Sequence, residues 1–181
     1  MIRIPARPDP DAAAPLELRA PQPGDLGWIV ERHGATYAAE LGLDQRFEAL
    51  VARICADFVD RFQPGREACW IAARGAERLG SVMLVQARDE ATDAPRPGVA
   101  KLRLLLLEPH ARGLGLGKRL VRQCSDFARQ AGYERIVLWT QSGLTSARAI
   151  YAAEGYRLVH SAPGHGFGID VVNETWELAL R

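Results

Sequence analysis

The chain has 181 residues, of which 48% are hydrophobic and 25% are charged, and its formal net charge at pH 7 is +1. These proportions are typical of one globular domain and exclude a collagen-like, wholly disordered or disulfide-scaffold chain. The balanced charge indicates neither a nucleic-acid nor a membrane partner, and no apolar run approaches the roughly 20 residues of a membrane-spanning helix. Three widely separated cysteines (Cys55, Cys69 and Cys124) argue against a disulfide framework and predict a reducing, cytoplasmic location.

The N-terminal third predicts a tail, a short strand and two helices. Residues 1–14 hold three prolines among alanine and aspartate, which is typical of a flexible tail. A strand is expected at 16–20. Two helices are expected at 25–41 and 44–62, because each range begins at an aspartate, a common N-cap, and continues with helical apolar spacing.

Three strands are expected next, at 68–73, 78–87 and 99–108. A loop is expected at 89–98, where two prolines stand among charged residues. The third strand is the most apolar of the three. Regular alternation along it predicts two faces. One face carries Lys101, Arg103, Leu105 and Leu107, and the other carries Leu102, Leu104 and Leu106.

The second half of the chain alternates helices and strands. Helices are expected at 116–131 and from Ser142 or Thr145 to Glu154, each ended by a glycine. Strands are expected at 136–140, 156–160 and 169–180, with a glycine- and proline-rich loop at 160–168. The order β-α-α-β-β-β-α-β-α-β-β predicts an α/β fold of the mixed (α+β) kind, with one mixed sheet and helices on both faces. We expect a single domain at 15–181.

A glycine-rich segment joins the most apolar strand to the helix that follows it. Its sequence is Arg112-Gly113-Leu114-Gly115-Leu116-Gly117-Lys118. Glycines let the backbone come close to a ligand, and the first amides of a helix carry partial positive charge without an internal acceptor. The segment therefore predicts an anion site suited to phosphate or pyrophosphate. Arg119 and Arg122 add positive charge nearby.

Two familiar phosphate-binding motifs do not fit this segment. A P-loop needs glycine where Arg112 stands and serine or threonine where Arg119 stands. A dinucleotide fingerprint needs its last glycine where Lys118 or Leu120 stands. The pattern that does fit is Arg-x-x-Gly-x-Gly after a strand.

This pattern resembles the acetyl-CoA signature of the GNAT (Gcn5-related) N-acetyltransferase family, R/Q-x-x-G-x-G/A. A second stretch resembles that family's A-x-x-x-Y-x-x-x-G-[FY] block: Ala147-Arg148-Ala149-Ile150-Tyr151-Ala152-Ala153-Glu154-Gly155-Tyr156. The element order is also similar, and the resemblance covers residues 16 to 180. Shorter stretches resemble a subgroup often fused to a MarR-type winged helix: Lys101-Leu102-Arg103, Leu138-Trp139-Thr140, Phe167-Gly168-Ile169-Asp170 and Thr175-Trp176-Glu177-Leu178. We expect no such DNA-binding domain in this chain.

The resemblance implies a mostly antiparallel sheet and direct transfer of an acetyl group from acetyl-CoA to a primary amine of a small molecule or protein. It implies that the pyrophosphate binds the amides of Leu114 to Lys118, with Arg112 and Gly113 beside them. The pantetheine would pair with backbone groups of Leu105 and Leu107. Tyr151 stands at the family position of the general acid for the departing thiolate.

Other assignments stay open. His33, Glu40 and Glu67 are candidate bases, with His33 or Glu67 preferred, and a base acting through water is an alternative. Arg103 would bind a substrate carboxylate or pair with a protein carboxylate. Many family members have asparagine where Leu144 stands, which puts one contact to the pantetheine in question.

Two rival functions remain. The first is a non-catalytic acyl-CoA sensor on the same fold, and the second is a nucleotide-phosphate enzyme that uses the glycine loop. The helices at 25–41 and 44–62 and the loops at 89–98 and 160–168 would select the acceptor, which the sequence does not identify. The four histidines show no ligand spacing with the cysteines, so no metal is expected. A monomer or a homodimer is expected.

Overall fold

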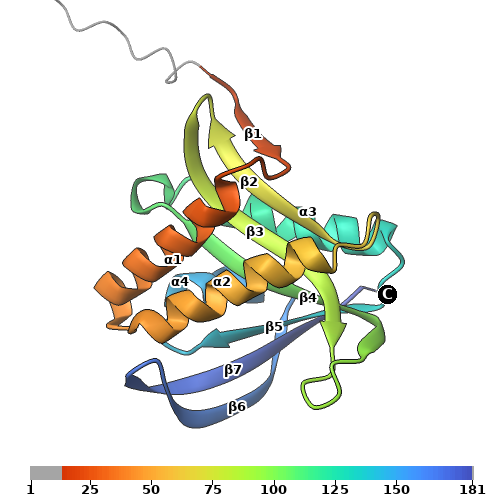
Figure 1. Ribbon diagram of the computed structural model, residues 1–181. Coiled ribbons are helices and arrows are strands. Elements are labelled where there is room, and N and C mark those ends of the chain that lie inside the picture. The colour runs from red at the N-terminus through yellow and green to blue at the C-terminus, as the bar shows by residue number, and fades with distance from the viewer. Residues whose placement is uncertain (1–13, 181) are drawn as a thin grey trace, which may run out of the picture.

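The computed structural model describes residues 14–180, which form seven strands and four α-helices in the predicted order (Figure 1). The strands are β1 (Leu16–Arg19), β2 (Ala68–Arg74), β3 (Glu77–Arg88), β4 (Pro95–Leu107), β5 (Arg135–Gln141), β6 (Arg157–Gly166) and β7 (Ile169–Ala179). The helices are α1 (Asp25–Leu41), α2 (Gln45–Asp60), α3 (Leu116–Gln130) and α4 (Thr145–Ala153), and a short 3-10 turn, η2 (Pro109–Ala111), precedes α3. The tail predicted for residues 1–14 lies, except for Ala14, outside the described residues.

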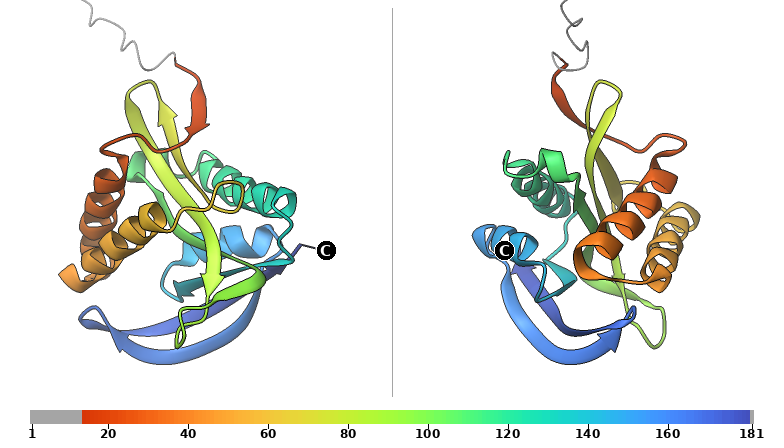
Figure 2. Two further views of the ribbon diagram at one scale, coloured as in Figure 1. Left: turned by 45° about the vertical axis from the view of Figure 1, so that its right-hand side comes forward. Right: turned by 90° about the vertical axis from the view of Figure 1, so that its left-hand side faces the viewer.

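The strands form one sheet in the order β1-β2-β3-β4-β5-β7-β6. Only β4 and β5 pair in parallel, and every other neighbouring pair is antiparallel. Helices α1 and α2 cover one face of the sheet, and α3 and α4 cover the other (Figure 2). The mixed, mostly antiparallel sheet with helices on both faces is therefore confirmed. No helix among residues 14–180 has the length and apolar character needed to span a membrane.

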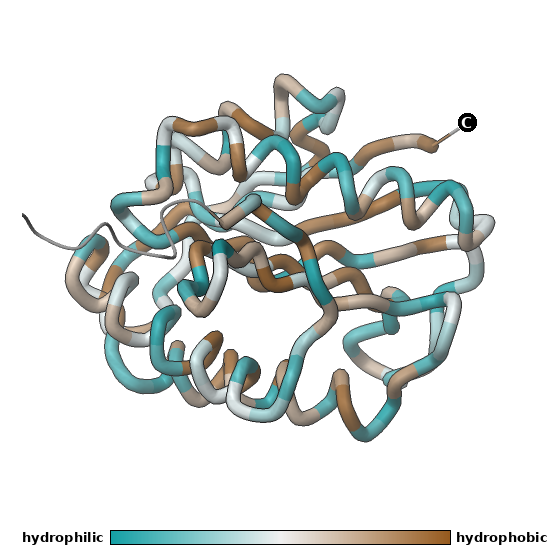
Figure 3. Tube along the Cα trace, turned by 90° about the horizontal axis from the view of Figure 1, so that it is seen from above, coloured by the Kyte–Doolittle hydropathy of each residue, from teal (hydrophilic) through white to brown (hydrophobic). Residues whose placement is uncertain are grey.

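Two separate apolar cores lie on the two faces of this sheet. One core joins α1 and α2 to β2 and β3 through residues such as Ile29, Val51 and Ile71. The other joins α3 and α4 to the central strands through residues such as Leu120 and Tyr151. Apolar residues follow the strands between the helices, as Figure 3 shows. The sheet separates the two cores, so a cavity that is lined from both of them needs a gap between strands.

The two helices on the first face begin in different ways. Asp44 caps α2 as expected, because its side chain accepts a hydrogen bond from the Arg46 amide. Asp25 is not the cap of α1, since Gly24 occupies that position in a left-handed conformation. The buried Asp25 carboxylate instead binds Arg19 and Arg78 at 2.6 and 2.7 Å. Its ion pairs fasten α1 to β1 and β3.

Both predicted loops are shorter than expected. Strand β4 begins at Pro95, so the loop at 89–98 is only partly irregular. The loop predicted at 160–168 is wrong, since β6 runs to Gly166 and pairs with β7 up to a two-residue turn. Both turn residues, Phe167 and Gly168, have positive φ (54° and 88°), as tight hairpins favour. Pro163 is tolerated because β6 is an edge strand.

A bulge in β4 breaks the alternation that we expected from the sequence. The register with β3 pairs Met83 with Arg103 and Ser81 with Leu106, so two β4 residues face one β3 residue. Leu104 has a φ of 54° at this point. As a consequence Leu104 packs on the α1/α2 core, whereas Leu105 packs on the α3/α4 core. The expectation that Leu105 shares a face with Lys101 and Arg103 is wrong.

Candidate functional site

The parallel strands β4 and β5 separate in the middle of the sheet. They pair only from Val99–Arg135 to Leu102–Leu138, although β4 continues to Leu107 and β5 to Gln141. The edge of β4 that faces β5 therefore has no strand partner beyond Leu102. Buried strand groups normally have hydrogen-bond partners, so an unpaired inner edge is a place where an extended ligand can bind.

A cavity of about 290 Å³ occupies this gap and is lined from both faces of the sheet. Tyr151 and Ala147 line it from α4, and His33, Phe47 and Ile54 line it from α1 and α2. Tyr151 and Ala147 pack in one core and Phe47 and Ile54 in the other, so the cavity passes through the sheet between β4 and β5. Two ligands could therefore approach each other there from opposite faces.

The glycine loop lies where β4 leads into α3. Among the described residues, the amides of residues 113–118 have no hydrogen-bond acceptor, and the first that finds one is the Arg119 amide, 3.1 Å from the Gly115 carbonyl. Gly113 and Gly115 have φ values of 79° and 76°, which favour glycine. The helix N-cap is Gly115, with no capping side chain. This run of unpaired amides at a helix N-terminus can bind a phosphate or pyrophosphate.

Cations surround this loop, and most of them have internal partners. Arg112 pairs with Glu40 at 2.7 Å. Lys118 and Arg122 share Glu154 at 3.5 and 2.8 Å. Arg119 forms no ion pair within residues 14–180, and its guanidinium donates only to the Leu16 carbonyl at 3.5 Å. An anion on the loop would therefore meet a set of cations of which Arg119 is the least committed.

Gly117 has a second role that the motif does not reveal. A Cβ at this position would lie 2.7 Å from Ile150 Cδ1 and 3.2 Å from Leu107 Cδ1. Glycine therefore allows α3 to approach α4 and β4 closely.

Of the two β4 leucines expected to pair with the pantetheine, Leu105 lines the cavity and Leu107 does not. The Leu107 carbonyl already accepts a hydrogen bond from Arg112 at 3.3 Å.

Tyr151 lies in the cavity at the interface of α4 with the sheet. Its side chain is 5% exposed, and its hydroxyl has no hydrogen-bond partner within the described part of the chain. Burial raises the pKa of Tyr151 well above the usual value near 10. The phenol therefore keeps its proton at neutral pH.

His33 lines the same cavity from α1. Its Nδ1 lies 2.8 Å from the Ile29 carbonyl, which can only accept, so Nδ1 carries the proton and Nε2 has a free lone pair. Nε2 is buried and has no partner. Burial lowers the pKa of the His33 imidazole to about 4, so it is neutral at pH 7.

The helix that carries His33 is held in place by an ion pair. Arg32 of α1 binds Glu108 at 2.6 and 2.9 Å, which holds α1 against the end of β4.

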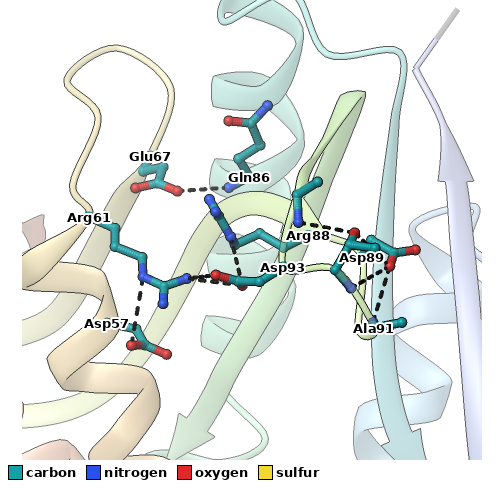
Figure 4. Close-up of polar contacts among 10 residues, drawn as sticks. Asp57, Arg61, Glu67, Gln86, Arg88, Asp89, Ala91 and Asp93 are labelled. Carbon is teal, nitrogen blue, oxygen red and sulfur yellow. Dashed lines mark hydrogen bonds and ion pairs between the residues drawn. The ribbon is translucent and has the colours of Figure 1, made fainter.

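The structure does not bring the two glutamates to this cavity. The Glu67 carboxylate accepts hydrogen bonds from the Gln86 and Gln63 amides at 3.0 and 3.2 Å, which links β3 to the segment after α2 (Figure 4). Glu40 is paired with Arg112. Of the three candidate bases, His33 alone lines the cavity with Tyr151.

Arg103 and Lys101 line the cavity from the face of β4 that carries α2, and Leu144 lines it from the start of α4. Lys101 is not among the site residues predicted from the sequence, although its alternation with Arg103 in an apolar strand is a usable signal. Tyr37 is another cavity residue outside that prediction, and it stacks on His33 with ring centroids 5.8 Å apart. No group of three or more metal-ligand side chains occurs among residues 14–180.

Comparison with known proteins begins with a family model described as the acetyltransferase (GNAT) family, which matches residues 39–156. Mycothiol acetyltransferase of Sanguibacter keddieii is 31% identical over 157 residues, which are 82% of this chain and 47% of that protein. N-acetyltransferase 8F1 of Rattus norvegicus is 30% identical over 104 residues, 56% of this chain and 45% of that protein. The chain spans about half the length of these curated relatives.

Solved structures show the same fold at low sequence identity. An acetyltransferase structure from Salmonella typhimurium, determined with its cofactor acetyl-CoA, has a TM-score of 0.74 at 17% identity and covers 92% of this chain and 94% of that chain. Ribosomal-protein-alanine N-acetyltransferase from Brucella melitensis has a TM-score of 0.73 at 16% identity, with coverages of 91% and 100%. The fold and the family match over residues 39–156 agree, and the chain belongs to the GNAT family of acetyltransferases.

Proposed function

We propose that this protein is an N-acetyltransferase that moves an acetyl group from acetyl-CoA to a primary amine. The observation that carries the proposal is the free edge of β4 beyond Leu102, with six unpaired amides at the glycine loop that follows this strand and a cavity in the gap that is lined by Tyr151 and His33. Family membership and the acetyl-CoA in a structural neighbour support the same assignment.

The binding residues follow from the unpaired groups. The amides of Leu114, Gly115, Leu116, Gly117 and Lys118 would hold the pyrophosphate, with Gly113 shaping the turn and Arg112 and Arg119 adding charge. The free edge of β4 at Leu105 would pair with the pantetheine arm. Leu144 offers no side-chain amide there, so this contact would come from the backbone alone. Acetyl-CoA supplies the acetyl group as a thioester.

Tyr151 and His33 would manage the protons of the reaction. The acceptor enters as a neutral amine after losing one proton to solvent. As the nitrogen–carbon bond forms, the amine gives a proton to His33 Nε2. As the carbon–sulfur bond breaks, the sulfur receives a proton from the Tyr151 hydroxyl. The proton on His33 returns to the Tyr151 oxygen through water, so neither side chain is consumed.

An imidazole with a pKa of about 4 holds this proton only briefly. His33 is therefore better suited to pass the proton on at once than to hold it as a general base. A base acting through water is the alternative route. A single domain at 15–181, a cytoplasmic location, a monomer or homodimer, and the likeness to MarR-linked acetyltransferases stay predictions of the sequence.

The proposal is tested first by thermal denaturation with acetyl-CoA, CoA, ATP and NAD. A ligand at 100 times its dissociation constant adds about 2.7 kcal/mol to the free energy of unfolding, which raises Tm by several degrees in a chain of this length. Of the four ligands, we expect only acetyl-CoA and CoA to raise Tm. A rise with ATP or NAD would favour a nucleotide-phosphate enzyme, and no rise with acetyl-CoA would refute the proposal.

Release of free CoA thiol in the presence of amines then separates an enzyme from a sensor. An enzyme releases thiol in proportion to the acetylated amine. An acyl-CoA sensor binds acetyl-CoA with the same rise in Tm but releases none.

A further inference from the structure

We propose that the acceptor is a free amino acid with an apolar side chain, whose carboxylate is bound by Arg103 and Lys101 while its amine faces His33 and Tyr151. This inference rests on the proposed function and names the substrate class of the same site. All four side chains line one cavity of about 290 Å³, so one small molecule can reach them together.

Two cations project from β4 into the acceptor side of this cavity. Arg103 and Lys101 are two residues apart on one strand, so their side chains leave the same face about 7 Å apart. Arg103 forms no hydrogen bond or ion pair within residues 14–180. Lys101 has one distant ion pair, 4.0 Å from Glu90, whose own side chain is 95% exposed. Neither cation is neutralised by a close protein partner.

The surroundings make this arrangement unfavourable without an anionic ligand. Burial lowers the pKa values of Arg103 and Lys101, and the Arg103 charge lowers that of Lys101 further. The carboxylates whose charge reaches Arg103 are those of Asp57 and Glu90, and neither is in contact with it. A ligand carboxylate placed between the two cations would supply the missing counter-charge, and arginine binds carboxylates in a two-point geometry.

The wall opposite the cations is apolar. Phe47, Leu50, Val51 and Ile54 line the cavity from α2. Phe167 lines it from the β6–β7 turn, and its ring lies 5.3 Å from that of Phe47. The Asp44 amide donates to the Phe167 carbonyl at 2.9 Å, which fixes this turn against the start of α2. An apolar body of the acceptor would pack on this wall.

Polar contacts hold in place the loop that follows β3, and Glu90 of this loop lines the cavity. Asp93 binds Arg61, the residue that follows α2, at 2.8 Å and Arg88 of β3 at 2.9 Å, as Figure 4 shows. Asp89 accepts hydrogen bonds from the Ala91 and Thr92 amides at 3.1 and 2.9 Å. The loop places the Glu90 carboxylate 4.0 Å from Lys101 but leaves it exposed, so the cation stays accessible to a substrate carboxylate.

The experiment compares amines that differ only by the carboxylate, using the full chain and saturating acetyl-CoA. Leucine, phenylalanine and tryptophan are each paired with the amine that lacks the carboxylate: isopentylamine, phenethylamine and tryptamine. Thiol release gives kcat/KM for each. Because hydrogen bonds to charged groups are strong, we expect at least one amino acid to exceed its partner by about 10-fold or more.

Three variants locate the effect. Arg103→Gln and Lys101→Gln should each lower kcat/KM for the preferred amino acid by about 10-fold or more while hardly changing that of its carboxylate-free partner. Their affinity for acetyl-CoA, measured by calorimetry, should stay unchanged. Arg53→Gln is the matched control, since Arg53 lies on α2 but is exposed and does not line the cavity. It should behave as the unaltered protein.

The outcomes separate the two proposals. The inference is overturned, and the proposed function stands, if acetyl-CoA binds but the carboxylate-free amines are used as well as the amino acids. The same holds if acetyl-CoA binds but the protein acetylates only a peptide N-terminus, or other amines and no amino acid. Equal losses for both members of a pair in Arg103→Gln would also overturn it, because the residue would then be structural. If acetyl-CoA does not bind, the proposed function fails and the inference with it.

Discussion

Burial acts in opposite directions on the proton affinity of two side chains in the cavity. Removing a group from water disfavours its charged form, so burial raises the pKa of Tyr151 and lowers that of His33 to about 4. Both groups are therefore neutral at pH 7, one as a proton donor and the other with a free lone pair. In the proposed reaction Tyr151 would give one proton to sulfur and His33 would take one from nitrogen.

Replacing Tyr151 by phenylalanine should separate catalysis from binding. Tyr151→Phe removes the proton donor and keeps the ring that packs near Tyr156 and Trp176. We expect kcat to fall about 100-fold or more, the range typical of general acids, with an unchanged dissociation constant for CoA. Steady-state thiol release and calorimetry measure the two quantities. Undiminished turnover would remove Tyr151 from the mechanism.

The His33 pKa predicts a pH dependence of stability. The folded pKa of about 4 lies below the unfolded value of about 6.5, so the unfolded chain binds the extra proton between these values. The stabilisation is complete above pH 6.5 and is lost as the pH falls toward 4. Between pH 7.5 and 5 it amounts to about 2 kcal/mol.

This contribution should disappear in His33→Gln, which keeps a polar side chain of similar size but cannot ionise. Urea unfolding at pH 7.5 and 5 gives the free energy of unfolding for each protein. The decrease on acidification should be smaller in the variant by about 2 kcal/mol. Equal decreases in both proteins would mean that the imidazole titrates normally in the folded state.

At the level of elements, the close approach of β3 and β4 depends on a glycine. A Cβ at Gly80 of β3 would lie 2.6 Å from the Leu106 carbonyl oxygen and 2.7 Å from Leu107 Cδ2. Both contacts belong to the end of β4 that borders the gap. A side chain at residue 80 would push this end of β4 away from β3.

Gly80→Ala should therefore lower the free energy of unfolding by about 1–3 kcal/mol, as overpacked substitutions do. Gly166→Ala is the matched control, because Gly166 is also a strand glycine but has no atom within 4 Å of an added Cβ. That variant should be nearly neutral. Urea denaturation of both tests the prediction, which fails if the two substitutions have the same effect.

The β4 bulge shows which part of an element the sequence does not reveal. Every residue from Leu104 to Leu107 is leucine, so a pattern of apolar residues cannot show where the strand changes face. The bulge depends on the pairing of Leu106 with Ser81 on another strand, whose hydroxyl donates to the Leu104 carbonyl at 3.2 Å. Only the tertiary contact fixes it.

At the scale of the whole molecule, the three thiols report on global opening. Cys55, Cys69 and Cys124 are all buried and free. Burial raises the pKa values of Cys55 and Cys69 to about 11 and about 12, and that of Cys124 well above its usual value. No thiolate nucleophile is therefore present at pH 8.

We expect an aromatic disulfide reagent at pH 8 to find no fast-reacting thiol in the native protein and three thiols after unfolding in guanidinium. Added acetyl-CoA, which carries no free thiol to react with the reagent, should slow the residual reaction, since a ligand that binds only the folded state reduces opening. One thiol reacting within seconds in the native protein would contradict the burial of its helix or strand.

The sequence by itself determined the element order, the helix that follows the glycine loop and the positions of Tyr151 and the loop amides. These features follow from local signals: glycine conformational freedom, apolar periodicity and two motifs of fixed spacing. The tertiary structure decided which candidate base reaches the cavity, because the sequence does not show that His33 lines it while Glu67 binds backbone amides elsewhere. It also decided that Lys101 and Arg103 share an open cavity with Tyr151, since β4 and β5 separate after Leu102 through contacts between residues far apart in the chain.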